Sequence, residues 1–120
     1  MTTLELPWPP SINNCLRLFR GRLVLSAEAR AYRQQVTKLL RSSPLKVAIG
    51  PVAMRLDLYP PDRRRRDCDN LQKVVLDALQ QGGAFLDDAQ IVWLLTIKKE
   101  VVPGGKVVVT MGQEYEDVLL

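Results

Sequence analysis

The residues best suited to chemistry lie between positions 62 and 90 of this 120-residue chain. Two carboxylates, Asp67 and Asp69, flank Cys68 directly after four consecutive arginines at 63–66. In an extended segment, side chains two residues apart point to the same side, so both carboxylates would face one way with their Cα atoms roughly 6.5 Å apart. Such a pair can share a hard metal ion while the neighbouring arginines hold phosphate groups.

A helix is expected to begin directly after this pair. Apolar residues recur at the spacing of one helical face, namely Leu71, Val74, Val75, Ala78 and Leu79. Asp69 or Asn70 would cap the helix start, since a short side-chain oxygen accepts from an orphan backbone N–H. Gly82-Gly83 would end the helix, because glycine adopts the left-handed conformation without a Cβ penalty. Lys73 follows Asp69 by one turn on the polar face.

Each of these features also has an ordinary structural explanation. Asp69 can be a helix cap, and Lys73 can be an ion-pair partner that contributes only about 0.3–0.5 kcal/mol. Asp87 and Asp88, in the short segment before an apolar run, can form a solvated turn, and the arginines can form an exposed loop. The combination favours function, because so many acids beside a basic run lower stability unless a cation neutralises them.

These motifs resemble those of the RusA-type Holliday-junction resolvases. The resemblance covers most of the chain and rests on residues 62–73 (DRRRRDCDNLQK), 77–79 (DAL) and 86–90 (LDDAQ), with 6–11, 13–14, 26–28 and 32–33. It implies a homodimeric enzyme that acts on four-way junction DNA with Mg²⁺. The implied catalytic residues are Asp67, Asp69, Lys73 and Asp88. The three aspartates would hold the metal, with Asp87 and Arg66 in support. Cys68 departs from the family pattern, in which a larger apolar residue is expected.

The whole-chain composition restricts the chemistry further. The chain contains no histidine, which removes His-based general bases, catalytic triads and the commonest zinc ligand. A hydrolase built from it must activate water with a metal held by oxygen ligands, which select Mg²⁺ with Mn²⁺ as a substitute. Cys15 and Cys68 lack the spacing of a zinc or disulfide motif. A net charge of +4 suits a nucleic-acid partner.

The chain shows no targeting or membrane pattern. No stretch reaches the roughly 18 apolar residues of a membrane span, and the first residues lack the basic and apolar regions of a signal peptide. We therefore expect a cytoplasmic protein without membrane association, and the resemblance implies a bacterial or phage origin. The sequence identifies no protein partner other than the second copy that the resemblance implies.

The hydrophobic pattern predicts an α+β domain, in which a mixed sheet and two main helices form two layers. The predicted order is β-α-β-α-β-β, with strands at 2–6, 52–59, 90–99 and 106–111 and helices at 26–41 and from 69 or 70 to 82. Residues 1–112 would form one domain, and the acidic residues 113–120 a mobile tail. We expect the strand end after Tyr59, the helix start at Asp69 and the turn at Asp87-Asp88 to converge.

Basic and polar side chains define the predicted DNA-binding surface, which comprises Arg63, Arg64, Arg65, Arg66, Arg17, Arg20, Arg22, Asn13 and Asn14. Arg17, Arg20 and Arg22 lie on an expected small hairpin around Gly21, where a solvated basic hairpin is the alternative. The asparagines lie in the preceding loop, within reach of phosphate.

The residues and the resemblance together predict a Mg²⁺-dependent, structure-specific endodeoxyribonuclease that resolves four-way junctions by paired symmetric nicks in DNA recombination and repair. Two alternatives stay open. A less selective Mg²⁺-dependent nuclease would use the same carboxylates on other DNA. A non-enzymatic basic DNA-binding module would use the aspartates only as caps and ion-pair partners.

Overall fold

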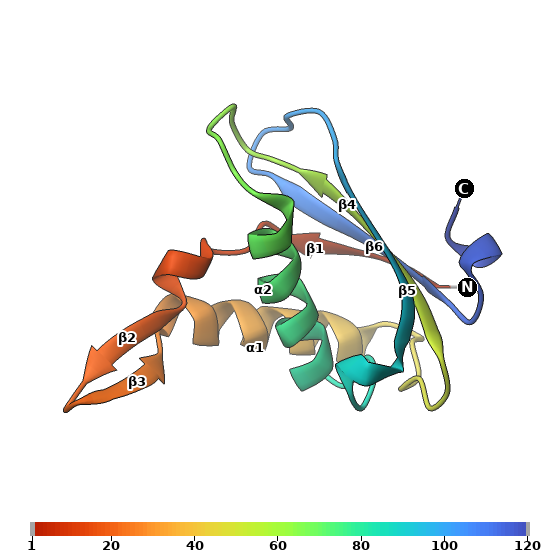
Figure 1. Ribbon diagram of the computed structural model, residues 1–120, viewed down its shortest axis with the longest axis horizontal. Coiled ribbons are helices and arrows are strands. Elements are labelled where there is room, and N and C mark those ends of the chain that lie inside the picture. The colour runs from red at the N-terminus through yellow and green to blue at the C-terminus, as the bar shows by residue number, and fades with distance from the viewer. Residues whose placement is uncertain (1, 120) are drawn as a thin grey trace.

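The computed structural model describes residues 2–119 (Figure 1). Within them, a four-stranded sheet, two α-helices, a separate two-stranded hairpin and three short 3-10 helices are formed. The elements in chain order are β1 (Thr2–Pro7), η1 (Ile12–Asn14), β2 (Leu16–Phe19), β3 (Arg22–Leu25), α1 (Ala27–Ser42), β4 (Val52–Tyr59), α2 (Cys68–Gln81), η2 (Asp88–Gln90), β5 (Ile91–Lys98), β6 (Lys106–Gly112) and η3 (Tyr115–Asp117).

The main sheet is mixed, as predicted. Its strand order is β1-β6-β4-β5, so the last strand in the chain lies between the first strand and β4. The β4–β5 pair is parallel, whereas β6 pairs antiparallel with both β4 and β1. The predicted α+β class and the order of elements are therefore confirmed.

Both α-helices cover one face of this sheet (Figure 1). The alternation along β4 places Met54, Leu56 and Leu58 in the core between sheet and helices, where their side chains are fully buried. From the helices, Val36 of α1 and Val75 of α2 are fully buried against them. The two prolines that follow Tyr59 end β4 and send the chain across to the start of α2.

The helix signals in the sequence are mostly confirmed. The Ser26 hydroxyl accepts a hydrogen bond from the Ala29 amide at 3.1 Å and caps α1, which keeps close to the predicted bounds of 26–41. At the end of α2, Gly83 adopts a left-handed φ of 92°, the conformation for which glycine was predicted here.

The acidic C-terminal segment, for which we expected mobility, packs against the sheet face opposite the helices (Figure 1). Val118 is only 1% exposed, and Arg55 Nη1 of β4 donates to the Leu119 carbonyl at 2.9 Å. The Tyr115 ring lies 6.1 Å from the Trp93 ring of β5, measured between centroids. The segment thus has a defined place over the central strands.

Candidate functional site

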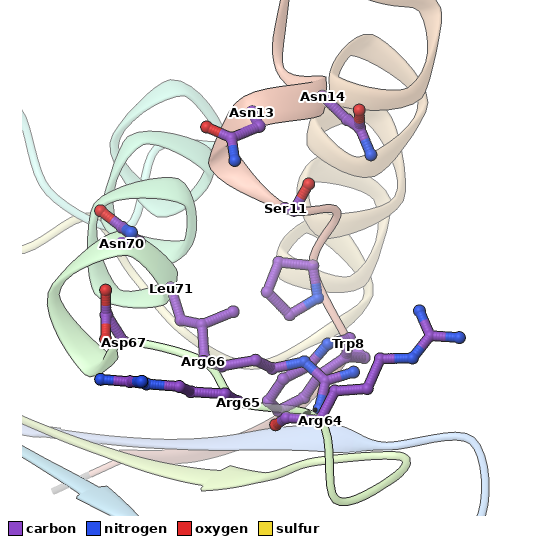
Figure 2. Close-up of a pocket in the computed structure, with 11 residues that line it drawn as sticks. Trp8, Ser11, Asn13, Asn14, Arg64, Arg65, Arg66, Asp67, Asn70 and Leu71 are labelled. Carbon is purple, nitrogen blue, oxygen red and sulfur yellow. Dashed lines mark hydrogen bonds between the residues drawn. The ribbon is translucent and has the colours of Figure 1, made fainter.

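An open cleft lies where the chain enters α2. Its volume is about 670 Å³, and its lining comes from the loop after β1, from η1, from the arginine run and from the first turn of α2. Figure 2 shows Asn13 and Asn14 on η1, Asp67 directly before α2, Asn70 on α2, and the arginines along a third side. Cations, amides and a carboxylate therefore share one water-accessible space.

Arg66 organises the arginine loop from within. Its Nη1 lies 2.8 Å from Asp62 Oδ1 and donates to the Asp62 carbonyl at 3.2 Å. Its guanidinium lies 5.5 Å from the centre of the Trp8 ring, and its side chain is only 19% exposed. Arg63, Arg64 and Arg65 are exposed. Arg66 thus holds the loop in place through its contacts, and the other three arginines are exposed to solvent.

The Asp62 carboxylate is held in its charged form by this loop. A hydrogen bond from the Arg66 side chain, followed by one from the Arg64 backbone amide, lowers the pKa of Asp62 below its ordinary value of 3.8. Because the folded-state pKa is lowered, the interaction stabilises the folded loop at pH values above the unfolded pKa. It is lost as the pH falls through the folded pKa.

An Arg66→Met variant tests this fastening. We expect the pKa of Asp62 to rise toward its ordinary value, because the largest cause of its lowering is removed. A carbon-detected NMR titration of the Asp62 carboxyl group in both proteins measures the change. The matched control is Arg63→Met, which removes an exposed arginine from the same loop. An unchanged pKa in Arg66→Met would contradict the assignment.

Asp67 and Asp69 lie at the start of α2, but not as expected. The predicted cap at Asp69 or Asn70 is wrong, because the helix begins at Cys68 and Asp67 is its N-cap residue. Asp67 is therefore extended while Asp69 belongs to the first helical turn, where its Oδ1 accepts from the Asn70 amide at 3.0 Å. The two carboxylates consequently do not share one side of an extended strand. Asp67 is exposed, makes no side-chain capping hydrogen bond and lines the cleft.

Lys73 lies one turn further along α2, on its exposed face. Its Nζ is 3.5 Å from Asp77 Oδ2, and its side chain is 66% exposed. Arg33 of α1 approaches the same Asp77 oxygen at 3.9 Å. An exposed pair of this kind contributes less than about 1 kcal/mol, so the ammonium group can leave Asp77 for a phosphate at little cost.

Asp87 and Asp88 lie at the opposite end of the sheet. Because β4 and β5 are parallel, the start of β5 lies beside the start of β4, with Val52 opposite Ile91. Asp67, by contrast, follows the end of β4, and the 14 residues of α2 span about 21 Å between the two regions. The predicted convergence of the three segments is therefore wrong for a single chain. Among residues 2–119, no three acidic or cysteine side chains gather closely enough to hold a metal ion.

The two aspartates before β5 differ in what they do there. Asp87 Oδ1 accepts from the Ala89 amide at 2.8 Å, and the Asp87 amide donates to Gln90 Oε1 at 2.9 Å. Gln90 in turn donates to the carbonyl groups of Ala48 and Gly50. Asp87 is thus a capping residue that fixes the turn, whereas Asp88 beside it is exposed.

The remaining predicted DNA-binding residues fall in two places. Asn13 and Asn14 line the cleft, as described above. The arginines at 17, 20 and 22 belong to the β2–β3 hairpin, which projects from the body of the molecule (Figure 1). Arg17 pairs with Glu28 at 3.6 Å, and Arg20 lies 5.2 Å from the Phe19 ring centre. The predicted hairpin is therefore confirmed, and it carries its charge away from the cleft.

Two residues of this region were not among the predicted site residues. Trp8 supports Arg66, and a lone tryptophan between prolines was the available signal. Lys98, at the end of β5, donates from its Nζ to the Arg66 carbonyl. No sequence pattern places Lys98 there, because its position depends on the parallel pairing of β5 with β4.

Comparison with known proteins gives a consistent result. Residues 7–111 match the family described as Endodeoxyribonuclease RusA. A protein of Shigella sonnei (strain Ss046), named crossover junction endodeoxyribonuclease RusA, is 46% identical over 116 residues, which cover 93% of this chain and 97% of the relative. The protein of that name from Escherichia coli (strain K12) is 45% identical over 116 residues, with the same coverage. One from Enterobacteria phage 82 is 46% identical over 115 residues, covering 92% of this chain and 96% of the relative.

The fold, the basic cleft and these matches define the class as that of endodeoxyribonucleases, which hydrolyse phosphodiester bonds within DNA. The chain belongs to the RusA family. Within residues 2–119, no helix combines the length and the apolar character needed to cross a membrane.

Proposed function

We propose that this protein is a Mg²⁺-dependent endodeoxyribonuclease that resolves four-way DNA junctions by paired nicks, as a homodimer in the cytoplasm of a bacterial host. Its place would be in DNA recombination and repair. The observation that carries this proposal is the exposed Asp67 carboxylate, which has no capping hydrogen bond and lines the same cleft as Arg64 and Arg65. The arginines attract the DNA backbone and so bring its phosphates close to the carboxylate. The two negative groups repel each other unless a cation lies between them.

The donors at the start of α2 fit a hard metal ion. Asp67 and Asp69 are two exposed carboxylates separated by one residue, and oxygen donors of this kind are those that Mg²⁺ prefers. In this proposal Asp67 and Asp69 hold the ion together with Asp88, which would come from the second copy of the proposed homodimer, because within one chain Asp88 lies at the other end of the sheet. When bound, it supplies a water of lowered pKa and neutralises the charge that develops on the cleaved phosphate.

The other residues of the site bind and orient the DNA. Arg63, Arg64 and Arg65 hold phosphates next to the one that is cut, because they are exposed beside the cleft. Lys73 exchanges its partner Asp77 for the reacting phosphate and stabilises the leaving oxygen as a fixed cation. Asp87 and Arg66 act indirectly, since the first caps the turn before β5 and the second fastens the arginine loop.

The test is cleavage of a labelled synthetic four-way junction and of its matched linear duplex, each with Mg²⁺ and with EDTA. We expect paired nicks that require Mg²⁺ and are confined to the junction. Equal cleavage of junction and duplex would replace this proposal with a less selective nuclease. Junction binding without any cleavage would replace it with a DNA-binding module.

The arginine run gives a separate prediction on binding. We expect the Arg64→Gln/Arg65→Gln protein to bind junctions more weakly. The slope of log K against log salt concentration should become less negative by about 1.8, which is about 0.9 for each phosphate that is no longer neutralised. Fluorescence anisotropy between low and moderate salt measures this slope. Lys38→Gln, an exposed charge on α1, is the matched control. An equal flattening in the control would show that net charge, not the cleft, accounts for the effect.

A further inference from the structure

The β2–β3 hairpin, residues 16–25, is a narrow arm with an anchored base (Figure 1). Its strands join through a two-residue turn at Arg20 and Gly21, whose φ values of 50° and 75° suit the twist of a hairpin. At the base, the Ser26 amide donates to the Cys15 carbonyl at 2.8 Å, and the Ser26 hydroxyl donates to the Asn14 carbonyl at 2.5 Å. The buried cap residue of α1 thus anchors the arm to the body of the molecule.

One face of the arm is formed by leucines. Residues directly opposite each other in an antiparallel pair lie on the same face, as do residues two apart along a strand. The four side chains on this face are those of the cross-strand pairs Leu16–Leu25 and Leu18–Leu23. Leu18 and Leu23, nearest the turn, are 74% and 71% exposed, and the hydrophobic core of residues 2–119 includes none of the four. The arm therefore presents an apolar surface that the fold leaves largely open.

The other side of the arm is basic. Arg17 and Arg22 lie on the face opposite the leucines, and Arg20 lies in the turn, 5.2 Å from the Phe19 ring centre. Residues 16–25 include no acid, and within residues 2–119 the one ion pair made by the arm joins Arg17 to Glu28 at 3.6 Å. An occupant that complements the arm must therefore offer apolar surface bordered by negative charge.

DNA bases bordered by phosphates have this combination of surfaces. The arm follows directly after η1, whose Asn13 and Asn14 line the cleft, so DNA bound in the cleft passes the base of the arm. Four residue pairs extend the arm by about 13 Å, which is about four base-pair steps of 3.4 Å. Two-stranded ribbons fit DNA grooves, and leucine is among the side chains that proteins insert between base steps. The tip can thus reach bases near the phosphates held in the cleft.

The state of the bases decides where such insertion is favourable. In a linear duplex each base pair is stacked on both sides, so inserting a side chain first costs the free energy of unstacking. Where four DNA arms meet, the continuous stack is interrupted, and base faces are accessible at lower cost. The arginines of the hairpin attract phosphates in either kind of DNA. The leucine face therefore adds affinity for a branch point that it does not add for a duplex.

We propose that the β2–β3 hairpin is a wedge that places Leu18 and Leu23 against base faces at the branch point, while its arginines hold the flanking phosphates. The inference rests on the proposed function, because it concerns the DNA on which that reaction acts. It adds the element that selects a junction over a linear duplex. This element lies outside the cleft and contributes none of the proposed metal ligands.

A Leu18→Thr/Leu23→Thr variant tests the wedge. Threonines keep a favourable cross-strand pair, so the hairpin should still form, and neither leucine belongs to the core. We expect the junction affinity to fall on the order of tenfold, with an unchanged salt slope and an unchanged affinity for the matched duplex. Fluorescence anisotropy in EDTA measures these affinities without cleavage. The matched control is Leu39→Thr/Ile49→Thr, which changes two apolar side chains exposed elsewhere and should bind as wild type does.

Three results of this comparison would overturn the wedge. An unchanged preference of the variant for the junction would assign the leucine face to a different occupant, such as a protein or a membrane. An equal loss of junction and duplex affinity would make the arm a general DNA contact. A lower molecular mass by light scattering would show that the leucines join two copies of the chain.

A second measurement uses the wild-type protein. The adenine analogue 2-aminopurine, whose fluorescence rises when it loses a stacked neighbour, is placed at the branch point or, as the control, in the middle of one DNA arm. We expect the protein in EDTA to raise the fluorescence at the branch point only, because leucine replaces a stacked base there. No rise at the branch point overturns the wedge. A rise there without any Mg²⁺-dependent cleavage supports the wedge and overturns the proposed function, so the two failures are distinguishable.

Discussion

Asp67→Asn removes junction cleavage and leaves junction binding intact or tighter. We expect the cleavage rate with Mg²⁺ to fall on the order of 10³-fold or more, since a metal contributes several kcal/mol of transition-state stabilisation and each 1.36 kcal/mol is about tenfold in rate. The fold should not change, because Asp67 is exposed and makes no capping hydrogen bond with its side chain. Binding should not weaken, because the amide no longer repels phosphate in a cleft shared with Arg64 and Arg65.

Single-turnover cleavage and anisotropy binding on the same labelled junction separate the two effects. The matched control is Glu5→Gln, an acid-to-amide change at an exposed position of β1, which should leave both quantities at wild-type values. Cleavage retained by Asp67→Asn would end the metal-site assignment at the start of α2. A parallel loss of binding and circular dichroism signal would instead give Asp67 a structural role.

The elements of this fold were readable from sequence because their local signals agree. In β4, Met54, Leu56 and Leu58 alternate with polar residues, and in α2 the apolar positions keep helical spacing from Leu71 to Leu79. The predicted cap at Asp69 or Asn70 lies two or three residues after the observed one, because Asp67, Asp69 and Asn70 are all good capping residues and local sequence does not choose between them.

Topology was the part that local signals do not contain. The sheet order inserts β6 between β1 and β4, so β5 becomes a parallel neighbour of β4 at the edge. Its direction decides which end of the sheet receives Asp88, and that direction is set by pairing between distant segments. The expected convergence of Asp67, Asp69 and Asp88 assumed that Asp88 lies at the sheet end where β4 stops, but it lies at the end where β4 begins.

The C-terminal segment shows a similar limit. Composition alone led us to expect mobility, since Glu114, Glu116 and Asp117 are charged. The mobility stays a prediction, but the structure gives the segment a position: Val118 is buried on the sheet face opposite the helices, where Arg55 donates to the carbonyl groups of Val118 and Leu119. Val118, which is buried, and Arg55, which is partly buried on a distant strand, fix the position of this segment. The sequence of residues 113–120 contains no pattern that predicts either contact.

The largest loss of stability is expected for Phe85→Ala. Among the fully buried side chains, that of Phe85 has the largest volume, and only 1% of its surface is exposed. It packs in the core between the two helices and the sheet. Removing its ring forfeits buried apolar area and leaves a cavity, so we expect the free energy of unfolding to fall by about 3–5 kcal/mol. For a domain of this size that is a large part of the total, which is typically about 5–15 kcal/mol.

Urea unfolding followed by circular dichroism measures this change, with a lower midpoint and an unchanged slope as the expected result. Leu86→Ala is the matched control, because the neighbouring side chain is 66% exposed and should change the free energy by less than about 0.5 kcal/mol. Both variants keep the backbone bridge between Ala48 and Phe85. An equal fall in the free energy of unfolding at the two positions would therefore contradict a special contribution of the buried Phe85 ring. A loss confined to Phe85 would assign to its ring the fixed position of the turn that carries Asp88.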